Sequence, residues 1–261
     1  MLRRFACRAI CIAMLAFGSH VAVPDYQRLP TATEIMEKVA EQDAAPDFSA
    51  RAEWKVFDTL GRQRIRESRI YRRDARRDGQ GYRTQWLTVL DFPDAVQGTR
   101  LLICTREAGG SDQWQYLGAY QQIRRLGPMV LGDTILESTL TFDDLRRTVG
   151  SEIHTLLRRE EDAAVIESTP RTPVAGYARR RTWVDLRHWT TRRVMFLGAD
   201  GVPVRDIEAH WKELSGGWLW QQLEITDFST KRRTVVELSD YIVGTLPAKM
   251  FSPAELPPVA P

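Results

Sequence analysis

The run Phe48-Ser49-Ala50-Arg51-Ala52-Glu53-Trp54-Lys55-Val56-Phe57 decides the fold class of this chain. Apolar residues occupy every second position from Phe48 to Val56, and mostly polar residues lie between them. Successive side chains of a β-strand point to opposite faces, so this alternation predicts a strand with one buried face and one solvated face. The residues that follow, Asp58-Thr59-Leu60-Gly61, are typical of a turn.

The same type of pattern recurs through most of the remaining chain. Turns at Ala199-Asp200-Gly201 and Ser229-Thr230 separate pairs of strand-like segments. A sheet of this many antiparallel strands has to curl or close. The sequence therefore predicts a mainly β protein with few helices (α+β), built on a curled antiparallel sheet. The further strands are expected over 63–72, 82–91, 99–105, 177–184, 192–198, 202–211, 218–228 and 234–243.

Two segments carry helical signals. Thr31-Ala32-Thr33-Glu34 is a capping box, and the apolar residues after it are spaced for a helix over about 32–43. Residues 141–148 have acids first and arginines after them, as the helix dipole favours. The charged residues 153–162 fit either a helix or a loop. We expect the helices to cover the concave face of the sheet and to enclose an apolar cavity.

Residues 1–18 have the features of a secretory signal peptide. Arg3 and Arg4 supply a positive start, Ala9–Phe17 supply a short apolar core, and Gly18 ends a small-residue cleavage site. The apolar core is about half as long as the roughly 20 residues that span a membrane. A buried N-terminal helix is the alternative. No later segment has 18 consecutive apolar residues, so we expect a soluble protein after cleavage.

The charge and the cysteine count change if this segment is removed. The full chain has 37 Lys and Arg against 34 Asp and Glu, a net charge of +3. Residues 1–18 contain three arginines and no acid, so their loss leaves 34 of each sign. Cys104 is then the single cysteine, which excludes an internal disulfide. A near-neutral chain also argues against a dedicated nucleic-acid binder.

The sequence offers little for catalysis or metal binding. His20, His154, His188 and His210 lack the spacing of metal ligands, and no G-x-S-x-G element is present. Asp143 and Asp144 point about 100° apart on a helix and cannot share a site. We expect no enzyme activity, no metal and no cofactor, although a triad assembled from distant residues stays open.

Eight tryptophans are the most distinctive feature of the composition. They either fill the core of the sheet or line a cavity for an acyl or polycyclic ligand. Trp218 and Trp220 are expected on one face of the same strand. The candidates for the cavity are Trp54, Trp86, Trp183, Trp218 and Trp220.

A set of ordered motifs resembles the bacterial outer-membrane lipoprotein-sorting protein family, the LolA-like periplasmic proteins associated with RND-type exporters. The motifs begin with Phe92-Pro93 and Gly98-Thr99, continue with the run from Trp114 to Leu126, and end with Tyr177 to Asp185. Gly118 stands where the family usually has Pro. The motif positions, which we expect to be structural, are Pro93, Gly98, Trp114, Tyr116, Arg124, Arg125, Gly132, Asp133, Asp144, Tyr177 and Trp183.

The resemblance implies an incomplete β-barrel capped by helices that holds a lipid or the acyl chain of a lipoprotein. It implies no catalytic residues. The expected function is that of a monomeric periplasmic carrier beside an RND-type exporter, with an interaction module whose cavity is self-filled as the alternative and an unrecognised hydrolase as a third possibility. The expected organisation is a signal peptide over 1–18, an extended leader over 19–30, a LolA-like domain over 31–256 and a tail over 257–261.

Overall fold

The computed structural model describes most of the chain from residue 29 onward. The predicted signal peptide, most of the leader, the predicted helix after Thr141 and the motif residues Gly132, Asp133 and Asp144 lie outside the described residues. The described ranges are 29–41, 46–108, 110–127, 135, 137–141, 149–174, 176–215 and 217–257.

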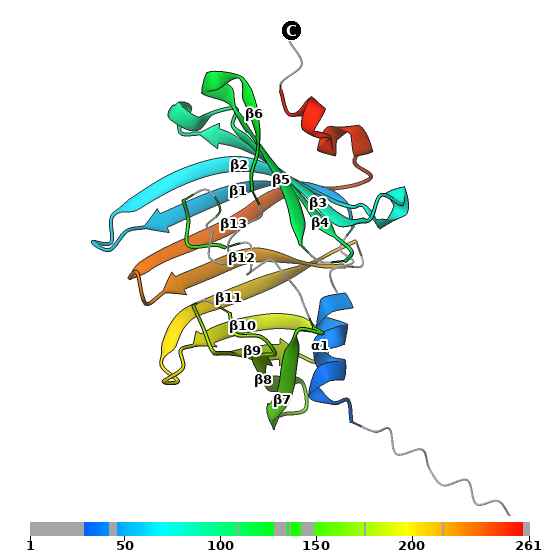
Figure 1. Ribbon diagram of the computed structural model, residues 1–261, viewed down its shortest axis with the longest axis vertical. Helices are drawn as coiled ribbons and strands as arrows, with labels where there is room; N and C mark the ends of the chain where they lie inside the picture. The colour runs from blue at the N-terminus through cyan, green and yellow to red at the C-terminus, as the bar shows by residue number, and fades with distance from the viewer. Residues whose placement is uncertain are drawn as a thin grey trace, which may run out of the picture.

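Thirteen strands form one antiparallel sheet that curls and does not close (Figure 1). The mainly β fold predicted from the alternating pattern is therefore confirmed. The strands are β1 (Phe48–Phe57), β2 (Gln63–Asp74), β3 (Tyr82–Phe92), β4 (Arg100–Arg106), β5 (Ser111–Leu117), β6 (Gln122–Arg125), β7 (Glu152–Arg159), β8 (Ala163–Pro170), β9 (Arg179–Asp185), β10 (Thr190–Leu197), β11 (Pro203–Leu214), β12 (Gly217–Asp227) and β13 (Arg232–Val243).

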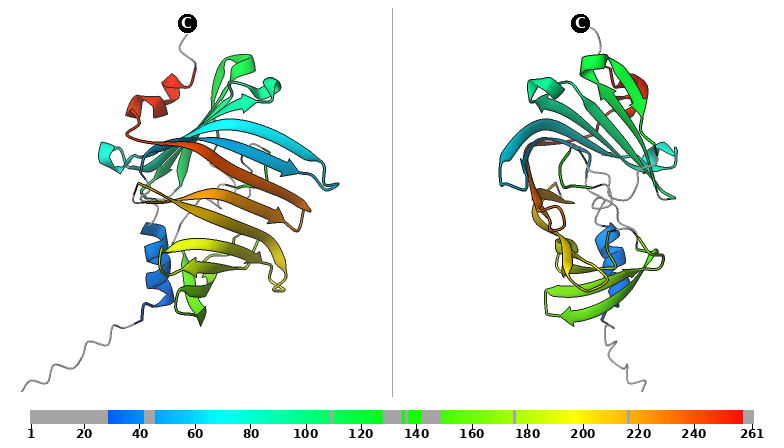
Figure 2. Two further views of the ribbon diagram at one scale, coloured as in Figure 1. Left: turned by 180° about the vertical axis from the view of Figure 1, so that it is seen from behind. Right: turned by 60° about the vertical axis from the view of Figure 1, so that its left-hand side comes forward.

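The order of the strands explains why the sheet stays open. Strands β6 and β7 form the two edges, at the top and the bottom of Figure 1. Consecutive strands pair throughout, except β6 and β7, and one further pairing joins β1 to β13 in the middle of the sheet. The chain therefore runs outward from β1 to one edge, crosses to the other edge and returns to β13. Figure 2 shows how the sheet bends around one side.

The two faces of the sheet differ in chemistry. On β1, Phe48, Ala50, Ala52 and Trp54 are buried on the concave face, as the alternation predicts. The other face of the central strands is convex and carries ion pairs exposed to water. These pairs are Arg51–Glu67, Lys55–Glu237, Arg69–Asp91, Arg193–Asp206 and Arg233–Glu224.

Helix α1 (Ala32–Glu41) covers one end of the sheet. The capping box forms, because the Thr31 amide donates to Glu34 Oε2 at 2.6 Å and the Glu34 amide donates to Thr31 Oγ1 at 3.3 Å. The buried side of the helix, including Ile35 and Val39, packs against β8 and β9 at Ala164, Ile166 and Val184. The helix predicted over 32–43 is thus confirmed over its described residues.

The C-terminal segment covers part of the convex face. Two short 3-10 turns, η4 (Ala248–Phe251) and η5 (Pro253–Glu255), follow β13 and lie beside β3 and β4 (Figure 1). Phe251 and Leu256 pack there against Leu87, Leu102 and neighbouring side chains. This part of the convex face is therefore a second core, and the free thiol of Cys104 is buried in it.

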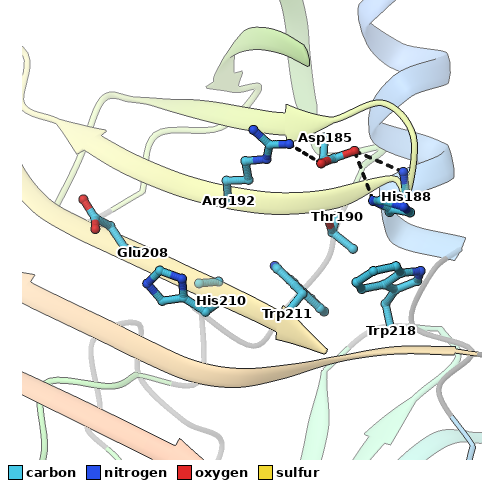
Figure 3. Close-up of a pocket in the computed structure, with 9 residues that line it drawn as sticks. Asp185, His188, Thr190, Arg192, Glu208, His210, Trp211 and Trp218 are labelled. Carbon is cyan, nitrogen blue, oxygen red and sulfur yellow. Dashed lines mark hydrogen bonds and ion pairs between the residues drawn. The ribbon is translucent and has the colours of Figure 1, made fainter. Parts of the chain in front are cut away.

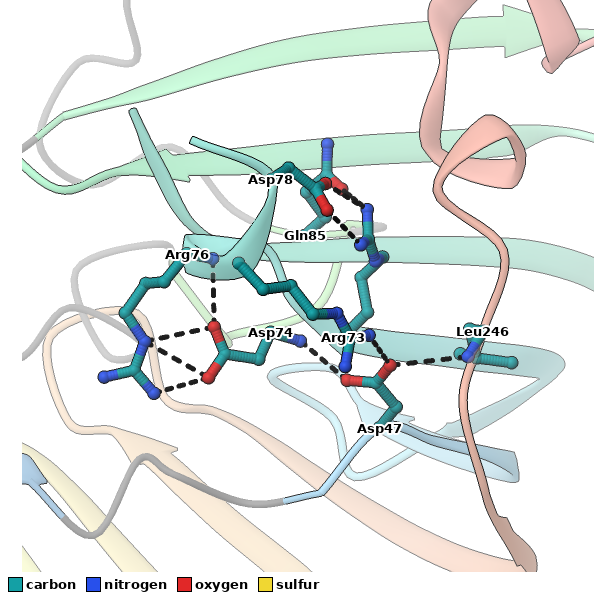
Figure 4. Close-up of polar contacts among 8 residues, drawn as sticks. Asp47, Arg73, Asp74, Arg76, Asp78, Gln85 and Leu246 are labelled. Atoms are coloured by element: carbon teal, nitrogen blue, oxygen red, sulfur yellow. Dashed lines mark hydrogen bonds and ion pairs between the residues drawn. The ribbon is translucent and has the colours of Figure 1, made fainter. Parts of the chain in front are cut away.

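An ionic network ties three segments together at one end of the sheet (Figure 4). Asp47 accepts the Asp74 amide at 2.8 Å and the Leu246 amide at 3.3 Å, and it also pairs with the Arg77 guanidinium. Arg73, which is buried, donates to both carboxylate oxygens of Asp78 at 2.6 and 2.8 Å. The start of β1, the turn after β2 and the segment after β13 are thereby held together.

The prediction of a helix or loop over 153–162 was wrong for most of this segment. Residues up to Arg159 belong to β7, an edge strand whose side chains are mostly exposed, so the sequence shows no alternation. Strands β5, β6 and β8 were not predicted either. Strand β6 has four exposed residues and again lacks a buried face. Periodicity fails at β6 and β7 because these edge strands keep most of their side chains in water.

Candidate functional site

The concave face of the sheet carries a continuous apolar surface, which we call the concave cluster. It is built from the inward-facing side chains of β1, β2 and β4 on one side of the β1–β13 pair and of β10 to β13 on the other. Because these strands span both halves of the sheet, the cluster crosses the whole central part of the molecule. Its buried members on the strands are Phe48, Ala50, Ala52, Trp54, Ile70, Leu101, Ile103, Phe196, Ile207, Leu219, Leu223, Ile225, Val236 and Leu238.

Part of the connection between β6 and β7 fills this surface. We call residues 135 and 137–141 the plug. Ile135 and Leu140 are buried members of the concave cluster, and a hydrogen bond of 2.7 Å from the Ile135 amide to the Leu140 carbonyl closes the turn between them. The plug thus covers apolar side chains of the sheet with two of its own.

Few polar contacts fasten the plug to the sheet. The Thr139 amide donates to Thr234 Oγ1 at 2.9 Å, and Thr139 Oγ1 donates to the Ile225 carbonyl at 3.2 Å. The guanidinium of Arg205 donates to the Thr139 carbonyl. At its outer end Glu137 forms an ion pair with Arg66 at 2.5 Å. The Arg232 guanidinium also donates to the Glu137 carbonyl at 2.8 Å, so Thr139 and three arginines hold the plug.

Three of the five candidate tryptophans lie at the concave cluster. Trp54 is 3% exposed and donates from Nε1 to Ser68 Oγ at 3.0 Å. Trp86 packs edge-on to Phe48 with ring centroids 6.0 Å apart. Trp220 packs against the same cluster, and its carbonyl accepts the Tyr241 hydroxyl at 3.3 Å. Burial raises the pKa of Tyr241 to about 12, so this hydroxyl stays protonated.

The other two candidate tryptophans lie elsewhere. Trp183 pairs across strands with Arg193 and Val165 on the convex face, and the Arg193 guanidinium lies 5.2 Å from its ring centroid. Trp218 packs against the ring of His188, with centroids 4.2 Å apart. A strand alternation alone does not say which face is concave, so the sequence could not separate these two tryptophans from the others.

Trp218 and His188 border a second site, a pocket with both polar and aromatic walls, that sequence reasoning missed (Figure 3). This pocket has a volume of about 370 Å³ and lies at the end of strands β9 to β12. Burial of Asp185 opposes its ionisation, but hydrogen bonds from Arg192 and from the His188 and Arg187 amides outweigh it and lower the pKa of this carboxyl. The lining residues are Asp185, His188, Thr190, Arg192, Glu208, Ala209, His210, Trp211 and Trp218.

The first family motifs lie at the turns of the upper strands. Pro93 follows Phe92 through a cis peptide bond at the end of β3. Gly98 has φ +74° and donates its amide to the Leu90 carbonyl at 2.8 Å. Gly118 lies so close to the Gln97 carbonyl that an added Cβ would come within 3.0 Å of its oxygen. These glycines allow the turn after β3 and the turn after β5 to touch.

The arginine pair and the later motifs have packing partners. Arg125 pairs with Asp112 at 2.9 Å and lies over the ring of Trp114, while Arg124 is exposed on the opposite face of β6. Tyr116 is buried in the core under the C-terminal turns. Tyr177 packs edge-on to Phe196, a member of the concave cluster, with centroids 4.9 Å apart.

The described residues offer little nucleophilic or metal-binding chemistry. Among them, no group of three or more His, Cys, Asp or Glu is placed to hold a metal ion. Burial raises the pKa of Cys104 to about 11, so its thiol is protonated. His154 Nδ1 lies 2.8 Å from Ser168 Oγ, but Ser168 has 0% exposure, and the other ring nitrogen contacts the Val149 carbonyl at 3.1 Å. This pair binds β7 to β8 and presents no hydroxyl to a substrate.

The fold is thus a curled, open antiparallel sheet whose apolar concave face is covered. A family model described as "-like: Uncharacterized protein" matches residues 83–257, more than half of the chain, and the chain belongs to this family. No functionally curated protein matches the chain.

Solved structures agree on the fold. A DUF1329 family protein from Desulfovibrio piger superposes with a TM-score of 0.75 at 20% identity, over 86% of this chain and 97% of that chain. A domain assigned to outer membrane lipoprotein sorting from Vibrio parahaemolyticus gives a TM-score of 0.75 at 23% identity, with the same two shares. A LolA superfamily protein from Nitrosomonas europaea gives 0.61 at 18% identity, over 86% of this chain and 98% of that chain. These likenesses show a shared fold.

Proposed function

We propose that this protein is a non-enzymatic carrier of a lipophilic molecule, a lipid or the acyl chain of a lipoprotein. The observation that carries the proposal is the concave cluster, a broad apolar surface that crosses the central strands of the sheet. Apolar burial is worth about 0.8 kcal/mol for each CH₂ group, so an acyl chain needs only a dry surface of this kind and no specific polar partner. The Vibrio parahaemolyticus domain named for outer membrane lipoprotein sorting and the LolA superfamily protein from Nitrosomonas europaea have the same fold.

The ligand would lie where the plug now lies. Ile135 and Leu140 occupy the concave cluster, so the ligand has to displace them. Shortening Leu140 weakens the contact between plug and sheet and raises the fraction of molecules in which the surface is accessible. The apparent affinity rises with that fraction. A carrier with Leu140→Ala is therefore expected to bind a fluorescent fatty acid more tightly than the unmodified protein after both have been delipidated.

Leu87→Ala is the matched control for this experiment. Leu87 is a buried leucine of the convex core, so its truncation should cost similar stability without touching the concave cluster. If the delipidated protein binds no fatty acid and no lipid co-purifies with it, the carrier proposal is wrong. If Leu140→Ala and Leu87→Ala change fatty acid binding equally, the ligand does not displace the plug.

The tryptophans supply a second test of the same surface. Trp220→Ala removes a ring that packs against the concave cluster, whereas Trp183→Ala removes a ring on the convex face. Trp220→Ala should weaken fatty acid binding, and Trp183→Ala should leave it unchanged. A loss of stability with unchanged affinity for Trp220→Ala would assign this ring to the core alone.

The burial of the plug also favours a second candidate, an interaction module of an envelope complex whose cavity is filled by its own side chains. In that case Ile135 and Leu140 are permanent core residues. Truncating Leu140 would then cost about 2–5 kcal/mol of stability, as in other cores, without creating a lipid site. Fatty acid titration of Leu140→Ala separates the two candidates, because only the carrier gains affinity.

We further propose that the carrier works in the periplasm as a monomer beside an RND-type inner-membrane exporter. The signal-like residues 1–18 support export, and the domain over 31–256 would be the mature carrier, preceded by the leader 19–30 and followed by the tail 257–261. Among the described residues, no helix is long and apolar enough to cross a membrane. Mass spectrometry of the periplasmic protein would give its mature N-terminus, its co-purifying lipid and any exporter cross-linked to it.

A further inference from the structure

The exposed apolar side chains are concentrated at one end of the sheet. Because the strands are antiparallel, the turns that follow β1, β3, β5, β10 and β12 all lie at the same end. We call this end the hairpin rim. Several of its hairpins project along the left-hand side of Figure 1. The exposed apolar residues of its turns and strand ends are Leu60 (75% exposed), Phe92 (45%), Tyr120 (69%), Val202 (55%) and Phe228 (45%).

Three more exposed apolar side chains, Ile65, Ile123 and Ile153, lie near the starts of strands that begin at this rim. Single exposed apolar residues are normal on any protein surface, but a concentration at one end calls for a partner. Among the described residues, the exposed large apolar side chains outside the rim are fewer: Leu29, Leu156, Leu157 and Ile242.

The charges follow the same division. Arg64, Arg124, Arg171 and Lys231 are exposed at or beside the hairpin rim, and among the described residues none of them is ion-paired. Among the described residues at this end, Asp94 and Asp200 are exposed without an ion pair, whereas Asp58 pairs with Arg62 at 2.7 Å and the exposed Glu137 pairs with Arg66 at 2.5 Å. The turns at the opposite end and the residues beside them carry the exposed acids Glu107, Glu161 and Glu213 and also the exposed bases Arg187 and Lys212. The rim is thus both apolar and positive, whereas the far end carries exposed charges of both signs.

We propose that the hairpin rim docks on an anionic phospholipid surface. Exposed Leu and aromatic side chains at the hairpin tips would enter the boundary between head groups and acyl chains. The unpaired arginines and Lys231 would meet the lipid phosphates, while the far end would face away from the membrane. This combination of apolar tips with positive charge distinguishes a lipid surface from a neutral apolar partner.

The proposal stands independently of any ligand on the concave cluster. If the carrier function holds as well, docking brings the plug close to the membrane, because Glu137 is held by Arg66 and Arg232 near the starts of β2 and β13. A lipid could then pass between the bilayer and the concave face without crossing water.

The test measures co-sedimentation of the protein with lipid vesicles. Vesicles of phosphatidylethanolamine with phosphatidylglycerol should bind the unmodified protein, and vesicles of phosphatidylcholine alone should bind it more weakly. Added salt should reduce the binding, because it screens the head groups. The double variant Leu60→Asp with Phe228→Asp should lose about tenfold in partitioning.

The matched control places the same change at the other end. Leu29 and Ile242 are exposed to a similar degree but lie away from the rim. Leu29→Asp with Ile242→Asp should stay within about twofold of the unmodified protein. A second pair, Arg64→Glu with Lys231→Glu, should abolish the preference for anionic vesicles, whereas Lys249→Glu should not. Melting temperatures of all variants check that each one is folded.

The docking proposal is overturned if the unmodified protein ignores anionic vesicles, if both lipid compositions bind equally, or if the rim and control variants lose binding equally. Fatty acid titration of the same samples keeps the two proposals apart. If the protein binds vesicles but no fatty acid, the carrier proposal is wrong and the docking proposal stands. If it binds fatty acid but no vesicles, the docking proposal is wrong and the carrier proposal stands.

Discussion

Asp47 is a single carboxylate that holds three separate segments of the chain. Its two oxygens accept hydrogen bonds from the backbone of β2 and from the segment after β13, and they pair with Arg77. Asp47 is 7% exposed, so water cannot replace these partners. The carboxylate is therefore needed as an acceptor at both oxygens.

We expect Asp47→Asn to lower the free energy of unfolding by about 1–3 kcal/mol. The amide keeps the shape of the side chain but replaces one acceptor oxygen with a donor and removes the charge, which leaves a buried donor unsatisfied. Urea denaturation measures the change. Asp94→Asn, at an exposed position, should stay near the unmodified protein. Equal stability of the two variants would show that the network contributes nothing.

The tryptophans show which placements the sequence predicts and which it does not. The placement of Trp54 follows from alternation along β1, whereas the placement of Trp183 on the other side depends on which face of the curled sheet is concave. The pocket around Trp218 is assembled from strands β9 to β12. Its residues are spread along the chain, so no local motif predicts it. Local spacing thus predicts which residues share a strand face, and the curl of the sheet decides what each face meets.

Helix α1 is an element whose position depends on a small set of side chains. Ile35 has no exposure and packs with Met36 and Val39 against β8 and β9. We expect Ile35→Ala to cost about 2–4 kcal/mol of stability, since it removes buried methyl groups and leaves a cavity. Glu37→Ala, on the exposed side of the same helix, is the control. The result is checked by thermal and urea unfolding of both variants, and equal stability would mean that α1 is not docked in solution.

The secondary-structure elements differ in how well the residue pattern predicts them. Strand β1 and helix α1 were predicted because each buries one face and exposes the other. Strands β6 and β7 were not, because an edge strand is hydrogen-bonded on one side only and here keeps most side chains in water. The plug has no periodicity at all. Its burial comes from contacts with strands β12 and β13, which are distant in the sequence.

The whole molecule should lose stability in acid. Hydrogen bonds from Arg76 lower the pKa of Asp74 to about 2. At Asp58, Asp112, Asp185 and Asp227 burial opposes ionisation, but hydrogen bonds outweigh it and lower the pKa as well. A carboxyl whose pKa is lower in the folded state stabilises the protein above its ordinary pKa, and this contribution disappears as the pH falls through the folded value.

We therefore expect the free energy of unfolding to be constant near neutral pH and to fall from about pH 4 down to about pH 2. Urea denaturation across this range measures the slope. Asp74→Asn should have a shallower slope than the unmodified protein, because one of the titrating groups is gone. A stability that rises on acidification would contradict the assignment of these carboxylates as stabilising ions.

The pairing of β1 with β13 makes two strands from opposite ends of the folded chain adjacent in the sheet. Phe48 and Val243 lie opposite each other in the centre of the sheet, although nearly the whole folded chain separates them. Every other pairing joins consecutive strands. A circular permutant that joins the two ends and opens the chain between β6 and β7 would run from edge to edge through consecutive pairings alone. Its contact order would be lower, so it should refold faster than the natural order of strands.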